Sequence, residues 1–437
     1  MLSGPALYTP SGVRAESGAR GRGGVPSRTV GRRRFLETRL TELALLLAVA
    51  LGLGVVVVNA GTDRLQQYSL LAESFLDGRL DVRPDRSAHD EPTHREGARY
   101  VPMGPAPAVL LVPFVAAGRA LGFFFRQGYL APFLTAGVLW LAWRLALRLG
   151  HRREDAFLLA FAYVFGSAYL GQAALPISNF FAHVVVTVLL FAALLEQEGR
   201  QRPLWIGALL AAALATRFTA GVGLLYFAAR AALGPGTLDE RARRLAWMAL
   251  PVVAVGTLLL AYNAARFGDP FDTGYAAQAV PDPLQHAARS YGLTSLRHLP
   301  GNLYYMLLSL PIPVFAEGTV SVFTAPWFRP NPWGMSVFVT SPWLAYLFAL
   351  RRPDRRTGLL LATAAVVAAP LLLTWSMGYA QYGYRFALDF MPFVWTALVV
   401  GLRTRFGGVP LGFRVAVVFA ALLNAYLVGM MLVEATG

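Results

Sequence analysis

The sequence predicts an all-α polytopic membrane protein with about eleven transmembrane helices. Of its 437 residues, 56% are hydrophobic and only 14% are charged, whereas about a quarter of the residues of a soluble domain are charged. The mean hydropathy is +0.49, and apolar runs long enough to cross a bilayer recur along the chain. The charges are too few to cover the several soluble domains that this length would otherwise indicate.

The basic side chains separate two interpretations of the net charge of +15. A soluble protein with this charge would be expected to bind nucleic acid. Here the Arg residues lie in short connections between apolar runs, which is the positive-inside pattern of a membrane protein and argues against nucleic acid as a partner. The chain contains no Lys and no Cys, which excludes Schiff-base chemistry by a lysine, thiol catalysis and disulfides.

The N-terminal segment is predicted to be a disordered basic tail over residues 1–34, because it is rich in Gly, Arg, Ser and Pro and has no hydrophobic period. A transmembrane domain over 35–437 follows, and its first span covers 40–58. The charged region before this span is too long for a signal peptide. The tail is therefore expected in the cytoplasm.

Ten further spans are predicted where apolar runs are bounded by Arg or Pro: 128–149, 155–171, 178–197, 203–216, 217–233, 245–263, 336–350, 357–376, 384–402 and 411–433. Two other apolar runs, 106–122 and 301–316, are assigned to the outer interface, because only then do all the Arg-rich connections lie inside. Pro311 and Pro313 also argue against a straight span. Two long external segments remain, 61–127 and 264–335, and loops of this length usually carry function.

The first external segment carries the acidic and imidazole side chains that we consider first. Its apolar residues between 65 and 75 have helical spacing, which predicts an amphipathic helix on the membrane surface. Asp63 precedes this helix and is either its cap or an active-site carboxylate. His89, Asp90 and His94 form either a solvated loop or a divalent-metal site, although their spacing matches no recognised ligand signature.

Several segments together resemble the GT-C superfamily, in particular bacterial membrane glycosyltransferases of the protein O-mannosyltransferase and aminoarabinose transferase type. The resemblance runs from about residue 59 to 400 and depends on Asp63 and on the segments 68–81, 89–107, 263–275, 299–305, 329–334 and 383–392. It implies a GT-C-like bundle with interfacial helices in the first external loop. The sequence departs from the related enzymes at Met103-Gly104-Pro105, where they often carry Lys-Pro-Pro.

The resemblance and the chemistry together assign roles to candidate residues. Asp63 is the first candidate for the base that accepts the acceptor's proton, and Asp90 is the second, as a helper or metal ligand. The resembling enzymes take a sugar from a polyprenyl-phosphate carrier, so cations are needed for the phosphate that departs. Arginines suit this role, because a guanidinium is always charged and donates two parallel hydrogen bonds. The donor-site candidates are Arg385, Arg217, Arg266, Tyr384, Tyr100 and His183.

Structural alternatives stay open for three of these residues. Arg385 can be an interfacial anchor, Arg217 can solvate a turn, and His183 can be a packed, hydrogen-bonded side chain. The sequence thus predicts a glycosyltransferase of the bacterial inner membrane, with a polyprenyl-phosphate sugar as donor and a periplasmic glycolipid, cell-wall polymer or protein as acceptor. Membrane lipids are the expected surroundings. A transporter or flippase of lipid-linked intermediates is the alternative, and it predicts functional charges near the midplane.

Overall fold

A computed structural model describes residues 28–61, 65–83, 93–95, 97–175, 177–280, 282–350 and 354–436. The described chain is mainly helical, as predicted. Six of its helices are long and apolar enough to cross a membrane, which supports a multi-pass protein but does not establish eleven spans. They are Arg32–Gly61, Gln127–Arg148, Ser178–Gln197, Leu238–Phe267, Arg355–Leu372 and Leu411–Glu434.

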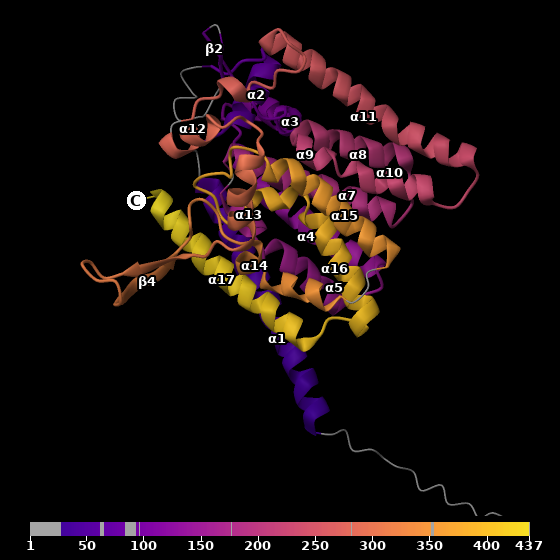
Figure 1. Cartoon of the computed structure of the whole chain (residues 1–437), viewed down its shortest axis with the longest axis vertical. Coiled ribbons are helices and arrows are strands. Elements are labelled where there is room, and N and C mark those ends of the chain that lie inside the picture. Colours follow the sequence, from indigo (N-terminus) through magenta and orange to yellow (C-terminus); the bar gives the residue numbers. More distant parts are fainter. Residues whose placement is uncertain are drawn as a thin grey trace, which may run out of the picture.

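The helices follow the predicted order along the chain (Figure 1). The first half contains α1 (Arg28–Gly61), α2 (Gln67–Leu76), α3 (Ala106–Ala120), η2 (Gln127–Tyr129), α4 (Ala131–Arg148), α5 (Arg153–Val164), α6 (Tyr169–Ala174), α7 (Ser178–Gln197), α8 (Pro203–Thr216), α9 (Phe218–Gly221) and α10 (Leu224–Leu233). The second half contains α11 (Leu238–Phe267), η3 (Tyr275–Ala277), α12 (Pro283–Arg289), η4 (Leu296–His298), α13 (Leu299–Leu307), α14 (Val337–Thr340), η5 (Pro342–Ala349), α15 (Arg355–Leu372), η6 (Arg385–Asp389), α16 (Met391–Phe406) and α17 (Leu411–Thr436).

The predicted tail, 1–34, overlaps the start of the first helix. Helix α1 begins at Arg28, so residues 28–34 are helical. The local composition of Gly and Arg concealed this extension, because the apolar pattern begins only further along the chain. The remainder of the predicted tail, 1–27, lies outside the described residues.

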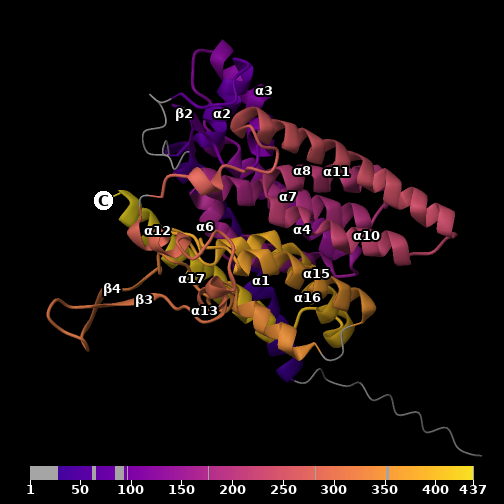
Figure 2. The same ribbon diagram turned by 45° about the horizontal axis from the view of Figure 1, so that its top comes forward.

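Two short antiparallel hairpins also correct the all-α prediction. The first pairs β1 (Thr93–Arg95) with β2 (Ala98–Tyr100), and the second pairs β3 (Ile312–Phe315) with β4 (Phe323–Arg329). The second hairpin projects from the helices in both views (Figure 1, Figure 2). The apolar run 301–316 is accordingly not one long helix, since α13 ends at Leu307 and a strand begins five residues later.

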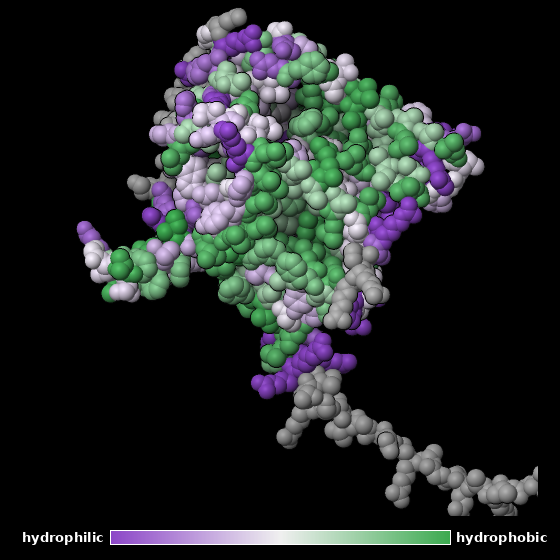
Figure 3. Space-filling model, viewed as in Figure 1, coloured by the Kyte–Doolittle hydropathy of each residue, from purple (hydrophilic) through white to green (hydrophobic). Residues whose placement is uncertain are grey.

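The helix bundle has two ends, which we name after the residues that lie there. Arg414, at the start of α17, donates from Nη1 to Thr41 Oγ1 of α1 at 2.8 Å, so the two helices start at the same end. Arg356, at the start of α15, lies 2.7 Å from Glu198 at the end of α7, and Arg148 of α4 contacts the same residue. We call this the Arg-rich end and the opposite one the site end. Hydrophobic residues cover most of the face between them (Figure 3).

Breaks within two predicted spans, 155–171 and 336–350, are stabilised by side chains from distant helices. Trp343 Nε1 donates to the Gly166 carbonyl at 2.6 Å, between α5 and α6. Asn424 Nδ2, from α17, donates to the Thr340 carbonyl at 2.9 Å and reaches the Phe165 carbonyl at 3.3 Å. Backbone groups freed inside an apolar bundle must find such partners, because no water replaces the lost helical bond.

Candidate functional site

The centre of the site is the carboxylate of Asp389, the last residue of η6, which is fully buried. Its oxygens accept hydrogen bonds from Arg217 Nε at 2.7 and 2.9 Å. The Thr219 hydroxyl donates to the same carboxylate. A buried charge is tolerated when it is both paired and hydrogen-bonded, as this one is.

Arg217 reaches Asp389 from a break between two helices. Its backbone is extended, with φ −148° and ψ 115°, between the end of α8 and the start of α9. Only Nε contacts Asp389, and Nη1 and Nη2 donate no hydrogen bond to any described residue. The side chain is 19% exposed. Arg217 therefore presents two nitrogens, Nη1 and Nη2, that can bind an anion while the Asp389 carboxylate at Nε balances its charge.

His183 is the third group on Asp389. It lies in the second turn of α7, fully buried, and its Nδ1 is 3.3 Å from Asp389 Oδ1. Its ring centroid is 6.1 Å from that of Phe386. Its contacts place it behind Asp389, as part of the support of the carboxylate.

Arg385 opens the helical turn that Asp389 ends, and it is also buried, at 8% exposure. Its guanidinium carbon lies 5.2 Å from the ring centroids of both Phe180 and Phe386. The guanidinium carbon of Arg217 lies 5.6 Å from the same Phe386 ring. One aromatic ring thus contacts two arginines, and its quadrupole offsets part of their mutual repulsion.

Two tyrosine hydroxyls are within electrostatic reach of these arginines. Burial raises the pKa of Tyr275, in η3, whereas Arg217, Arg266 and Arg385 each lower it. Burial also raises the pKa of Tyr68, in α2, and Arg217 lowers it. The Tyr68 hydroxyl has no hydrogen-bond partner among the described residues. The two external segments therefore each contribute a phenol whose pKa Arg217 lowers.

Arg266 and Tyr100 form a joint between α11 and the first external segment. Arg266 Nη1 donates to the Val101 carbonyl and Nη2 to Asn263 Oδ1, both at 2.8 Å. Its guanidinium carbon is 3.9 Å from the centroid of the Tyr262 ring. Tyr100 packs edge-on against Phe267 at 5.3 Å. Arg266 is thus anchored to protein groups and acts on the site mainly through its charge.

Tyr384, directly before η6, is fully buried. Its hydroxyl donates to Asn302 Oδ1 of α13 at 3.2 Å. The chain leading to Arg385 is held closely against α6, since a Cβ on Gly171 would lie 2.4 Å from Tyr382 Cβ. Gln172 Nε2 donates to the Tyr382 carbonyl at 2.9 Å. These contacts position η6 rather than form the site itself.

The first external segment packs against the end of α8, directly before Arg217 in the chain. A Cβ added to Gly104 would lie 2.2 Å from the Ala215 carbonyl oxygen and 2.9 Å from that of Thr216. These are the last two residues of α8. Only glycine allows this approach, so Met103-Gly104-Pro105 lies against the backbone that carries Arg217.

Asp63, His89 and Asp90 lie outside the described residues. On one flank of Asp63, Asn59 Nδ2 donates to the Ala173 carbonyl at 2.8 Å. On the other flank, the Leu65 carbonyl accepts from the Ser178 amide at 3.1 Å, at the start of α7. Both flanks therefore lie at the site end, and the role of Asp63 stays a prediction.

The metal site is not tested by the described residues. They contain no group of three or more His, Asp or Glu side chains that could hold an ion. His94 lies exposed in β1, and its two predicted companions lie outside the described part of the chain.

Asp389 is the residue that sequence reasoning missed. It stands in the segment 383–392 that carries part of the resemblance, but no role was assigned to it. A signal was present, because a carboxylate within the apolar beginning of a late span is costly unless it is paired for a purpose. The partner, 172 positions away, could not be read from spacing.

Comparisons with known proteins give a distant similarity only. No family model matches the chain, and no curated protein matches it. The chain is similar to the apo structure of the Archaeoglobus fulgidus oligosaccharyltransferase, with 13% identity, a TM-score of 0.42, and coverage of 89% of this chain and 55% of that one. It is also similar to the archaeal oligosaccharyltransferase AglB from Archaeoglobus fulgidus in complex with an inhibitory peptide and a dolichol-phosphate, with 14% identity, a TM-score of 0.42, and coverage of 88% and 55%. The chain spans about half the length of these proteins, and similarity at this level assigns no activity to it.

Proposed function

We propose that this chain is a GT-C-type glycosyltransferase that transfers a sugar from a polyprenyl-phosphate carrier to an acceptor hydroxyl at the site end of the bundle. The observation that carries the proposal is the pairing of Arg217 with the buried Asp389, which leaves Nη1 and Nη2 available. A cation fixed in this way at the end of a membrane bundle suits the phosphate of a lipid carrier.

Arg217 and Arg385 are the proposed phosphate ligands. Negative charge gathers on the phosphate as the bond between the sugar and the carrier breaks, so fixed cations stabilise that transition state. Asp389 orients Arg217 through Nε, and His183 supports Asp389. Tyr275 and Tyr68 are proposed to donate hydrogen bonds to the same phosphate or to the sugar.

The chemical step is a single inverting displacement. The acceptor hydroxyl oxygen attacks the anomeric carbon, the bond from that carbon to the phosphate oxygen breaks, and the polyprenyl phosphate leaves with the electron pair. Asp63 is the proposed base that receives the hydroxyl proton. Asp90 is proposed to orient the acceptor. Arg266 and Tyr100 hold the first external segment in place, and Tyr384 positions η6.

The test uses the full chain in bilayer nanodiscs with radiolabelled polyprenyl-phosphate sugars and an extract of cell-envelope acceptors. Arg217→Ala, Arg385→Ala and Asp63→Asn are each expected to lower transfer by about 100-fold or more, the range of one lost transition-state contact. Arg153→Ala, an exposed residue at the Arg-rich end, is the matched control. Wild-type transfer rates in both Asp63→Asn and Arg385→Ala contradict the roles assigned here.

The same preparation separates the transferase from the flippase. Reconstituted vesicles are loaded with labelled carrier in one leaflet, and both translocation and sugar transfer are followed. Transfer without translocation supports the proposal. Translocation without transfer supports the alternative.

A further inference from the structure

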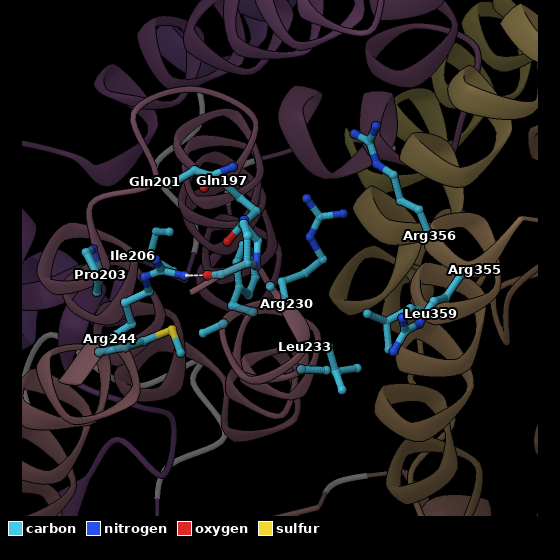
Figure 4. A pocket seen from close by; sticks show the side chains of 16 residues that line it. Gln197, Gln201, Pro203, Ile206, Arg230, Leu233, Arg244, Arg355, Arg356 and Leu359 are labelled. Carbon is cyan, nitrogen blue, oxygen red and sulfur yellow. Dashed lines mark hydrogen bonds between the residues drawn. The ribbon is translucent and has the colours of Figure 1, made fainter. Parts of the chain in front are cut away.

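A cationic cavity lies at the Arg-rich end, far from the Asp389 carboxylate. It has a volume of about 410 Å³ and lies between the ends of α7 and α10 and the beginnings of α8, α11 and α15 (Figure 4). Four arginines line it, Arg230, Arg244, Arg355 and Arg356, and no acidic residue does. Helices α7 and α8 also run to the candidate site, so the two regions are separated by about 20 to 30 Å, the length of these helices.

Two of the four guanidinium groups already have partners. Arg244 Nη1 donates to the Pro235 carbonyl at 2.7 Å, and its Nη2 is 3.9 Å from Glu240. Arg356 Nη2 is 2.7 Å from Glu198 Oε1. These contacts fix the two arginines on opposite walls of the cavity, as Figure 4 shows.

The other two arginines carry the excess charge. Arg230 lies between the two walls in Figure 4, and Arg355 lies on α15. Neither side chain makes a hydrogen bond or an ion pair with any residue in the described part of the chain. Two further positive charges that line one cavity favour a dianionic or monoanionic phosphate as its ligand.

The apolar lining of the cavity and the exposed tryptophans near it favour a phospholipid over a soluble compound as the source of that phosphate. Ile206, Phe227, Met248 and Leu359 give the cavity an apolar lining. Trp205 and Trp247 are 57% and 50% exposed on α8 and α11 beside it, and exposed tryptophans concentrate at the level of lipid headgroups. A soluble phosphate compound would gain nothing from the apolar walls, whereas a phospholipid places its glycerol and first acyl carbons there.

We infer that this cavity binds the headgroup of an anionic phospholipid of the adjacent leaflet, with Arg230 and Arg355 as the phosphate ligands. The inference is independent of the proposed transferase activity. Basic pockets between transmembrane helices are suited to such headgroups, because the protein charge and the leaflet's own negative lipids attract each other at short range.

The experiment is native mass spectrometry of the full chain released from detergent, titrated with phosphatidylglycerol, with phosphatidylcholine of the same acyl chains, and with inorganic phosphate. The wild-type chain is expected to retain phosphatidylglycerol preferentially. Arg230→Ala/Arg355→Ala is expected to weaken this binding about 25-fold, since each removed cation contributes about fivefold near an anionic surface. Arg153→Ala/Arg243→Ala removes the same charge from exposed positions outside the cavity and is expected to bind as the wild type does.

Arg230→Lys/Arg355→Lys keeps both charges and is expected to retain at least part of the preference for phosphatidylglycerol. If the double alanine variant does not fold, Arg355→Glu alone tests the site, because this position is exposed and tolerates substitution. This variant is expected to lower phosphatidylglycerol binding at least as much as the loss of one cation does. Equal binding of phosphatidylglycerol to the cavity variants and the control pair overturns the inference. So does displacement of the lipid by inorganic phosphate at equal concentration, which would show that the acyl region contributes nothing.

Discussion

Arg217 and Asp389 are joined by two short contacts from one nitrogen, at 2.7 and 2.9 Å, although 172 positions separate them in the chain. The geometry uses Nε alone and turns the fork of Nη1 and Nη2 away from the carboxylate. Asp389 therefore fixes the direction of the Arg217 side chain and balances its charge. The relationship makes Asp389 a positioning residue, which acts on a phosphate only through its partner.

Replacing Asp389 with Asn tests that relationship. The uncharged amide leaves Arg217 without its counter-ion, and breaking a buried pair lowers the free energy of unfolding by about 3 kcal/mol. Sugar transfer is expected to fall by about 100-fold, a loss of roughly 2.7 kcal/mol in transition-state stabilisation. Thermal unfolding in detergent and single-turnover transfer measure the two effects.

The control for that variant is Asp239→Asn, which removes an exposed carboxylate from α11 and is expected to cost less than about 1 kcal/mol. The double variant Asp389→Asn/Arg217→Gln is expected to lose less free energy of unfolding than its two single variants lose together, because the unpaired charge is gone. Strict additivity would show that the two side chains are energetically independent.

Arg217→Lys separates charge from geometry. A lysine keeps the positive charge but has a single nitrogen, which cannot bind Asp389 and present two parallel donors at once. We expect the KM for the lipid-linked donor to rise about tenfold, corresponding to one lost charge-assisted hydrogen bond. Steady-state kinetics over donor concentration measure it, with Arg153→Lys as the control. An unchanged KM would show that Arg217 does not bind the phosphate of the donor.

Gly104→Ala tests the contact behind Arg217. Its Cβ would overlap the Ala215 carbonyl, so the first external segment or the end of α8 must move, at a cost of about 1 to 3 kcal/mol. We expect transfer to fall together with stability. Gly137→Ala, in α4 with no atom within 4 Å of its added Cβ, is expected to be neutral or to gain up to about 1 kcal/mol. Similar behaviour of the two variants rules out the close approach.

Tyr275→Phe removes one hydroxyl beside the three arginines. Tyr275 is 39% exposed as a whole residue, although its hydroxyl is desolvated, so the loss of the hydroxyl is expected to leave the unfolding temperature nearly unchanged. The KM for the donor is expected to rise about fivefold, the effect of one neutral hydrogen bond. Tyr291→Phe, at a 57% exposed position in the same external segment, is the control. Equal kinetics for the two variants would remove Tyr275 from the site.

The sequence predicts the fold best where polar residues mark the ends of an apolar run. The spans 178–197 and 203–216 coincide with α7 and α8, because Pro203 starts one helix and a charged connection ends the other. It fails inside the apolar runs. The run 155–171 contains a break between α5 and α6, whose freed carbonyls are bonded by Trp343 and Asn424, and periodicity carries no information about such distant donors.

The same limit applies to the site. Arg217, Arg385 and His183 are candidates because ionisable side chains at membrane depth are costly, and the structure brings all three within reach of Asp389 or its neighbour Phe386. Arg266, Tyr100 and Tyr384 are candidates from the resemblance and from the chemistry of a phosphate, and their described contacts are with protein groups. Spacing along the chain cannot distinguish a cation that faces a ligand from one that stacks on Tyr262.

Helix α11 has 30 residues and is therefore about 45 Å long, whereas the hydrocarbon core of a bilayer is about 30 Å thick. One of its ends lies beside the cationic cavity and the other holds Val101 through Arg266. A helix with this excess length tilts as the bilayer becomes thinner. The height of the first external segment above the membrane should therefore follow acyl-chain length, so that lipids of different thickness reposition the candidate site without touching it.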